Sequence, residues 1–380
     1  MPTSLPAPLM SASQKAIDLL VYFQLCAKIR TMNWQLHEHD WAVNLLSNHA
    51  AQNLQGKLEM LRHAYLFTGP EGVGRRTLAI KFAQALNCTT PPEKGGYCGA
   101  CRDCRQIQSL VHPDVSLLVP KEGHKDILID QVRDLQRTLS LSPYMGAYRI
   151  ALLPDFQRAT TQAANALLKT LEEPPDKVVL LLTANAPEGL LPTIVSRCEV
   201  IRLRPAAIGS TQAYLETEKG LEIEKARLLA HLSGGRVGAA IRLAEDPTAL
   251  SRRGEHLADF LDLLPARHFE RFKLADRLSK PRNKSRQNLN EVLPIWLSFW
   301  RDVFMRSASE SLPLVNVDLE AQIDQVAAQV SPDVARALVV THEKAFQQLD
   351  AYANVQLLAE TLMLQWPLVK VSQVLHDFEE

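Results

Sequence analysis

The sequence predicts an α/β domain built on a parallel sheet with helices on both faces, followed by a small helical domain and an all-helical C-terminal domain. Three observations predict this fold class. Short apolar runs alternate with helical stretches in the N-terminal half, a glycine-rich loop follows the first run, and no convincing strand pattern occurs after Pro205. Alternating strands and helices favour parallel pairing, with both faces of the sheet covered.

Composition sets the limits of this prediction. The chain has 380 residues and a mass of 42.4 kDa, which suggests two or three domains. Apolar residues make up 46% and charged residues 22%, the profile of a globular protein rather than a disordered one. The 42 basic and 42 acidic residues cancel, so binding of nucleic acid through the global charge is not expected. No apolar run is long enough for a transmembrane helix, and we expect a cytoplasmic protein without a membrane partner.

Residues 1–31 differ from the rest of the chain, because early prolines precede a mostly apolar stretch at 16–29. A signal peptide is a weak interpretation, since no basic residue precedes Lys15 and no small-x-small cleavage site follows the apolar stretch. A short amphipathic helix is an alternative. We interpret residues 1–31 as a dispensable extension and Met32 as a candidate start of the protein.

The expected elements follow from the spacing of apolar residues. A helical pattern covers about 35–61, and the apolar run 64–68 predicts a buried strand with a helix at 77–86 behind it. Further strands are expected at 115–119, 150–153 and 178–182. Short helices are expected within 211–245, with a break at Gly234-Gly235. Helices then continue from about 250 to 380, separated by prolines at 265, 281, 294, 313, 332 and 367.

The loop after the first predicted strand has the glycine skeleton of a phosphate-binding loop, with Gly69, Gly72 and Gly74. Such a loop cradles phosphate with its backbone N–H groups, and next supplies Lys for the phosphates and Ser or Thr for Mg²⁺. This chain has Arg75 and Arg76 at those two positions, followed by Thr77. Arg is not equivalent to Lys at such a position, and a hydroxyl one residue late on a helix is rotated by about 100°.

The acidic partner of the metal is missing as well. The strand at 149–153 is followed by Pro154-Asp155, where a working site has adjacent Asp and Glu, so Asp155 alone remains. Two magnesium contacts are therefore lost. We expect no intrinsic ATPase activity; nucleotide binding without hydrolysis is left open.

Four of the six cysteines lie close together in a loop rich in Gly, Pro and Lys: Cys88, Cys98, Cys101 and Cys104. Four thiolates match a closed tetrahedral Zn²⁺ site, which leaves no position for water and is therefore structural. An iron–sulfur cluster and unliganded thiols are the alternatives. The remaining cysteines are far away in the sequence and are not needed for the site.

Two further segments carry a resemblance to a known family. Residues 165–175 (NALLKTLEEPP) followed by Ser196-Arg197-Cys198, together with the four-cysteine module, resemble the clamp-loader subunits of bacterial DNA polymerase III. The resemblance is strong over about 32–246 and weak beyond. It implies an AAA+ fold, with an α/β domain at 32–205 carrying a zinc module at 88–104, a helical lid at 206–247 and a helical collar at 248–380. The altered loop resembles the delta prime type, whereas the gamma/tau type carries Gly-Lys-Thr and Asp-Glu.

The resemblance implies a ring member that does not hydrolyse ATP and helps to load the sliding clamp on primed DNA during DNA replication. Its implied partners are the gamma/tau ATPase subunits and the delta subunit, with the clamp and primer–template DNA reached through the complex. Polymerase activity would belong to the holoenzyme. Arg197 would act in trans as an arginine finger at the neighbour's γ-phosphate. An ordinary ion-pair arginine is the alternative, and Glu172 and Glu173 are interpreted as solvated acids at a helix end.

Other residues match family positions with less defined roles. Asn185 and Arg236 match sensor positions, which would be vestigial without a nucleotide site in the same chain. Thr160 and Thr161 open the motif helix and are candidates for contact with the DNA backbone, although Thr160 is equally interpreted as a plain N-cap. Two rival functions are a gamma/tau-type ATPase, which needs the missing residues, and an independent zinc-module DNA-binding protein, which zero net charge disfavours.

Overall fold

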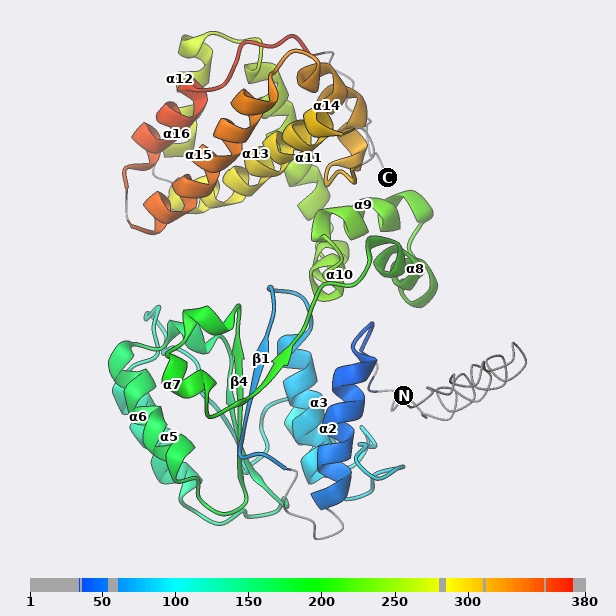
Figure 1. Cartoon of the computed structure of the whole chain (residues 1–380), viewed down its shortest axis with the longest axis vertical. Coiled ribbons are helices and arrows are strands. Elements are labelled where there is room, and N and C mark those ends of the chain that lie inside the picture. The colour runs from blue at the N-terminus through cyan, green and yellow to red at the C-terminus, as the bar shows by residue number, and fades with distance from the viewer. Residues whose placement is uncertain are drawn as a thin grey trace, which may run out of the picture. The chain divides into compact units, whose positions relative to one another are not determined.

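The computed structural model describes residue 34 and residues 36–53, 61–279, 285–309, 312–351 and 353–371. The interpretation of residues 1–31 and of Met32 falls outside the described residues. The chain divides into two compact units (Figure 1). Of the described residues, the first unit contains those up to Gly69 together with Gly74–Leu203, and the second contains Pro70–Val73 together with those from Arg204 onward.

The first unit is built on a five-stranded parallel sheet with the strand order β2-β3-β4-β1-β5. The central strand β4 pairs with β1 and with β3, so that Leu181 lies opposite Tyr65 on one side and Leu152 on the other. Every residue of β1, β3 and β4 is buried, because both faces of the sheet are covered. The strands are β1 (Ala64–Thr68), β2 (Val115–Leu117), β3 (Arg149–Leu153), β4 (Val178–Ala184) and β5 (Glu199–Arg202).

Helices cover both faces of this sheet, as predicted. In Figure 1, α2 and α3 lie on one side of β1 and β4, and α5 and α6 lie on the other. Leu135 of α5 and Leu167 of α6 pack with Leu180 in one core, and Phe82 of α3 packs edge-on against Tyr65 on the opposite face. The helices of this unit are α2 (Asp40–Asn53), α3 (Arg75–Asn87), α4 (Arg102–Gln108), α5 (Ile129–Leu139), α6 (Thr161–Glu172) and α7 (Pro192–Val195).

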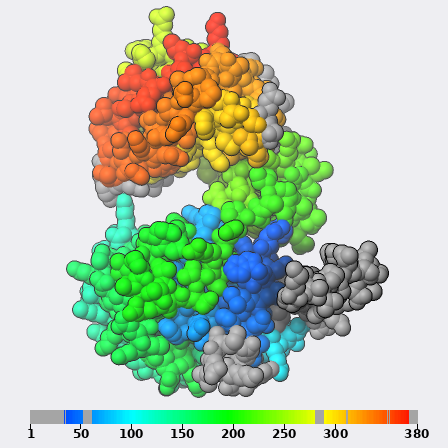
Figure 2. Space-filling view, viewed as in Figure 1, coloured from blue at the N-terminus to red at the C-terminus, as the bar shows by residue number. Residues whose placement is uncertain are grey.

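The strands predicted from the apolar runs are confirmed, and a fifth strand was missed. β5 has four residues, of which only Ile201 is fully buried, and it lies at the edge of the sheet next to β1. An edge strand of this length, with charged residues at both ends, carries no continuous apolar run. The green segment that runs from α6 to β5 forms a large part of the surface of this unit in Figure 2.

The described residues of the second unit form helices and loops, with no strand among them. It begins with α8 (Ile208–Lys219), α9 (Ile223–Ser233) and α10 (Val237–Glu245), with the predicted break at Gly234-Gly235. Gly234 ends α9 with φ 56° and Gly235 follows with φ 77°, a left-handed conformation that glycine adopts most readily. The later helices are α11 (Ala249–Leu263), α12 (His268–Ser279), α13 (Ser285–Ala308), α14 (Glu320–Ala327), α15 (Pro332–Asp350) and α16 (Val355–Leu364).

The prediction that Pro294 separates two helices was wrong. Pro294 lies inside α13, where it removes one intrahelical N–H donor and leaves the carbonyl of Asn290 without that partner. Both residues are exposed, so water can satisfy the carbonyl. The prediction for Pro332 fits better, because this proline occupies the first turn of α15 after the N-cap Ser331.

The core of the second unit is dominated by aromatic rings. Phe260 of α11 packs edge-on against Trp300 of α13 and against Trp366, which follows α16. Buried among these helices, Arg271 of α12 stacks on Trp366 with its guanidinium carbon 5.8 Å from the ring centre. None of the described helices is both long and apolar enough to cross a membrane.

Candidate functional site

The glycine loop connects β1 to α3 through three residues with positive φ. Gly69, Gly72 and Gly74 have φ angles of 144°, 83° and 106°, which residues other than glycine rarely adopt. The N–H of Gly69 donates to the carbonyl of Asn185 at 3.2 Å, which ties the start of the loop to the end of β4. Gly74 is the N-cap of α3, so the loop leads directly into that helix.

The middle of the loop packs against the start of α10. The N–H of Gly238 donates to the carbonyl of Gly72 at 2.8 Å. A Cβ atom at Gly72 would lie 2.7 Å from the Cβ of Ala239, so only glycine fits there. Arg236 contacts the carbonyl of Glu71 through Nη1 at 3.5 Å, and its Nε donates to the carbonyl of Ser233 at 2.6 Å. The predicted sensor-like Arg236 is therefore held by backbone oxygens in the second unit.

The position that would hold the phosphate-binding lysine carries a buried, paired arginine. The side chain of Arg75 is only 7% exposed, and its Nη2 lies 3.3 Å from Oδ1 of Asp155, whose side chain is 47% exposed. Asp155 has φ 49°, and its N–H donates to Oγ1 of Thr183 at 2.9 Å. Arg76 and Thr77 are exposed. The first unit thus joins the cation of the altered loop to the acidic residue after β3.

Arg197 lies at the surface turn between α7 and β5. Its side chain is 35% exposed; Nη2 is 2.8 Å from Oε1 of Glu172, and Nη1 donates to the carbonyl of Thr193 at 2.9 Å. Glu172 is the last residue of α6, so the two segments that carry the family resemblance meet through this ion pair. Cys198, next in the chain, has a pKa raised to about 12 by burial, which makes it an unreactive thiol.

The remaining predicted positions have simple local environments. Thr160 is the N-cap of α6, and its hydroxyl accepts from the N–H of Ala163 at 3.2 Å. Thr161 is exposed in the first turn of that helix, and Asn185 is exposed just after β4. The structure therefore satisfies the N-cap interpretation of Thr160, whose hydroxyl is already engaged within the chain.

The four predicted zinc ligands come together. The Sγ atoms of Cys88, Cys98, Cys101 and Cys104 all lie within 4.8 Å of one another, and those of Cys98 and Cys104 are 4.0 Å apart. Tetrahedral Zn²⁺ with Zn–S bonds of about 2.3 Å requires sulfur–sulfur distances of about 3.8 Å, so the geometry fits the ion. An all-sulfur donor set with no open position suits a structural metal rather than a catalytic one.

Hydrogen bonds prepare the sulfurs for a metal. The N–H of Cys101 donates to Sγ of Cys98 at 3.2 Å, and the hydroxyl of Thr90 donates to the same sulfur at 3.4 Å. The bond from Thr90 and that from the backbone lower the pKa of Cys98 to about 6, whereas burial raises the pKa of Cys104. Metal binding displaces the remaining protons, because thiolates are the ligands.

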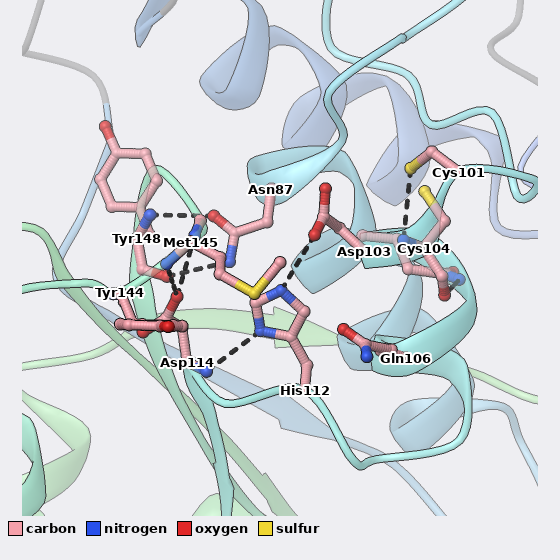
Figure 3. Close-up of polar contacts among 12 residues, drawn as sticks. Asn87, Cys101, Asp103, Cys104, Gln106, His112, Asp114, Tyr144, Met145 and Tyr148 are labelled. Atoms are coloured by element: carbon pink, nitrogen blue, oxygen red, sulfur yellow. Dashed lines mark hydrogen bonds and ion pairs between the residues drawn. The ribbon is translucent and has the colours of Figure 1, made fainter.

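A buried polar chain links the cysteine module to the sheet (Figure 3). Asp103, between two of the cysteines, lies 3.4 Å from Nε2 of His112. Nδ1 of His112 accepts from the N–H of Asp114 at 3.0 Å, so Nδ1 carries no proton and Nε2–H faces Asp103. Both His112 and Asp114 are almost completely buried. Sequence reasoning missed these residues, because isolated polar residues carry no spacing signal.

Asp114 in turn organises the loop before β3 (Figure 3). Its carboxylate accepts from the N–H groups of Tyr144, Met145 and Gly146 at 2.7, 2.7 and 2.8 Å, and Arg149 lies at 3.3 Å. Burial alone raises the pKa of this carboxyl, but the three N–H donors and Arg149 outweigh it and hold the pKa below the usual value. The cysteine module is thereby attached to the edge of the sheet.

Several known proteins with similar sequences are named as subunits of DNA polymerase III. The chain is 40% identical over 182 residues to DNA polymerase III subunit delta' of Pseudomonas aeruginosa, which covers 48% of this chain and 55% of that protein. It is 29% identical over 308 residues to the subunit delta' of Bacillus subtilis, covering 80% of this chain and 91% of that protein. The chain thus spans about half of the first relative and most of the second.

Among solved structures, a gamma subunit-related protein of Thermotoga maritima is similar to this chain, with 19% identity and a TM-score of 0.39 over 83% of this chain and 97% of that one.

The parallel sheet, the loop after β1 and the helical second unit define the class: an AAA+-type P-loop domain joined to helical domains. The family model described as DNA polymerase III, delta subunit, matches residues 42–207, and a second model, for the C-terminal part of the same delta subunit, matches residues 256–367. The chain belongs to the DNA polymerase III delta subunit family, and its relatives include several named delta'.

Proposed function

We propose that this chain is a delta prime-type subunit of the bacterial DNA polymerase III clamp loader, a ring member that does not hydrolyse ATP itself. The observation that carries the proposal is the combination of the family assignment with Arg75 at the lysine position of the phosphate loop, paired to Asp155. A motor subunit needs a lysine free to reach phosphate and an acidic pair for Mg²⁺. This chain has neither, which argues against the gamma/tau-type alternative.

The second part of the proposal concerns Arg197, which would stabilise the transition state in a neighbouring ATPase subunit. Its exposure at a surface turn supports this role, because a finger must reach beyond its own chain. An arginine delivered in trans contributes roughly 10³–10⁵ in rate at the site it serves. The gamma/tau and delta subunits are the proposed partners, and the clamp and primed DNA are contacted by the whole complex.

The remaining roles are supporting ones. The four cysteines would hold one structural Zn²⁺, which fixes a loop with too little apolar content to order itself. Asn185 and Arg236 would be vestigial sensors. Thr160 and Thr161 would add at most a weak contact to the DNA backbone, since the hydroxyl of Thr160 already caps α6.

Reconstitution with gamma/tau and delta subunits tests the function. The isolated chain should show no magnesium-dependent ATP turnover, whereas the assembled complex should hydrolyse ATP. Arg197→Ala should leave assembly intact and remove the turnover of the site that this subunit serves. Arg202→Ala, an exposed arginine on the neighbouring strand β5, is the matched control and should not change turnover. ATP hydrolysis by the isolated chain, or unchanged turnover with Arg197→Ala, would contradict the proposal.

A further inference from the structure

The guanidinium of Arg197 has two partners within its own chain. The carboxylate of Glu172 lies 2.8 Å from Nη2, and the carbonyl of Thr193 accepts from Nη1 at 2.9 Å. The side chains of Arg197 and Glu172 are 35% and 52% exposed. The charge of Arg197 is therefore balanced by an anion at the surface, and its terminal nitrogens are held against α6 and α7.

This arrangement conflicts with delivery of the arginine to a phosphate. A carboxylate at 2.8 Å cancels most of the positive charge that the neighbour's γ-phosphate would feel. If the pair persisted in the assembled ring, it would also place the negatively charged carboxylate of Glu172 beside the negatively charged γ-phosphate of the neighbour. The ion pair with Glu172 and the action of Arg197 as a finger are therefore mutually exclusive states of one side chain.

The pair is also of the kind that exchanges readily. Ion pairs between exposed side chains contribute little to stability, because water and salt screen them. A terminal phosphate carries more charge than a carboxylate and forms bidentate hydrogen bonds with guanidinium. A neighbouring ATP that comes close enough would displace Glu172, at small cost to the fold.

We propose that Glu172 is a latch on Arg197: it holds the arginine in its own chain and lowers ATP turnover until the neighbouring ATPase site closes on it. This inference rests on the proposed function, because it specifies how the arginine finger is regulated. Glu172 acts through Arg197 and touches no nucleotide, so it is a positioning residue. Its release makes the charge of Arg197 available at the step when the ring tightens.

The experiment measures ATP turnover of the reconstituted complex without clamp or DNA. Glu172→Gln keeps the shape of the side chain and removes its charge, and we expect basal turnover to rise about two- to five-fold, within the range that one exposed ion pair can produce. Glu173→Gln removes the same charge from the adjacent residue at the end of α6 and is the matched control, with turnover expected to stay unchanged. The thermal midpoint of the isolated chain should not change in either variant.

Epistasis separates the latch from the finger. The double variant Glu172→Gln/Arg197→Ala should behave like Arg197→Ala alone, because the latch has nothing left to hold. A decrease or no change with Glu172→Gln, or an equal increase in the Arg197→Ala background, would overturn the latch. Unchanged turnover with Arg197→Ala alone would instead overturn the proposed function. In the isolated chain, the Nε–H signal of Arg197 in NMR spectra should shift with Glu172→Gln and not with Glu173→Gln.

Discussion

The guanidinium of Arg75 lies 3.3 Å from the carboxylate of Asp155, although the two residues are 80 positions apart in the chain. In an active phosphate loop these two places would serve ATP and Mg²⁺. Here the cation and the acid neutralise each other within the protein. The unusual φ of 49° at Asp155 and the bond from its N–H to Thr183 fix the acid in that place.

Asp155→Asn should lower the free energy of unfolding by about 1–2 kcal/mol, because the buried guanidinium of Arg75 loses an ionic partner that is itself half-exposed. Asn tolerates the left-handed backbone conformation, so the loss reflects the charge rather than the backbone. Urea unfolding measures this loss in the free energy of unfolding. Asp176→Asn, at an exposed carboxylate, is the control and should change stability by less than about 0.5 kcal/mol. Equal stabilities of the two variants would show that the pair contributes nothing.

The cysteine module should contain close to one Zn²⁺ per chain when the purified protein is analysed for metals. Cys104→Ser should abolish zinc binding and lower the free energy of unfolding by roughly 2 kcal/mol or more, because the buried thiolate holds the module to α4. Cys198 lies outside the cluster, so the protein with Cys198→Ser is the control and should still bind zinc. Iron in place of zinc, or full stability of the metal-free protein, would contradict this prediction.

The sequence predicted the central strands for a physical reason. β1, β3 and β4 are buried on both faces, so each reads as a continuous apolar run that periodicity detects. β5 was not predicted because only Ile201 of its four residues is fully buried and both of its ends are charged, so it contains no continuous apolar run. The prediction that Pro294 separates two helices failed for a different reason. Whether a helix tolerates a proline depends on whether the carbonyl that loses its partner faces water, which the sequence does not show.

Some features of the candidate site could be predicted from the sequence, and others could not. The cysteine cluster could be predicted because its ligands are close in the sequence and have a recognisable spacing. The ion pairs of Arg75 and Arg197 join residues from different elements, so the sequence identified the arginines and the acids Asp155 and Glu172 separately but did not predict that they pair. His112 and Asp114 gave no signal at all, because their importance comes from burial beside the cysteine module and the loop before β3.

His342 should make the stability of the helical unit sensitive to mild acid. It is buried, with Nδ1 2.7 Å from the carbonyl of Leu338 and Nε2 accepting from the indole N–H of Trp366 at 3.3 Å. Burial lowers the pKa of His342 to about 4. Between pH 6.5 and 4 the unfolded chain binds the proton and the folded chain does not, so stability falls as the pH falls through this range. The expected loss between pH 7 and pH 5 is about 2 kcal/mol.

Urea titrations at pH 7 and pH 5 isolate this contribution when the wild type is compared with His342→Gln. The variant keeps a donor and an acceptor but does not titrate, so its stability should depend less on pH by about 2 kcal/mol. Burial also lowers the pKa of His49 and His63 in the first unit, and their contributions cancel in the comparison. His124→Gln, at an exposed histidine, should keep the dependence of the wild type; the same slope in His342→Gln would refute the assignment.

Arg271 is the residue whose replacement should most damage the helical unit. It is fully buried, and all five of its N–H donors reach backbone carbonyls at the ends of α11 and α16: those of Leu263, Leu264, Met363, Trp366 and Pro367. These carbonyls lie at or beyond the helix ends, where the regular helical hydrogen bonds stop. Those of Leu263, Leu264 and Met363 each also accept a backbone N–H, and Arg271 adds a second hydrogen bond to each. Lysine has three donors and no planar fork, so it cannot serve both helix ends.

Arg271→Lys should therefore lower the free energy of unfolding by about 2–4 kcal/mol, measured by tryptophan fluorescence in urea. Trp366 is a suitable reporter, because the guanidinium stacks on its ring. Arg267→Lys makes the same substitution at an exposed position one turn earlier and should change stability by less than about 0.5 kcal/mol. If both variants unfolded at the same urea concentration as the wild type, Arg271 would not join the two helix ends as the hydrogen bonds indicate.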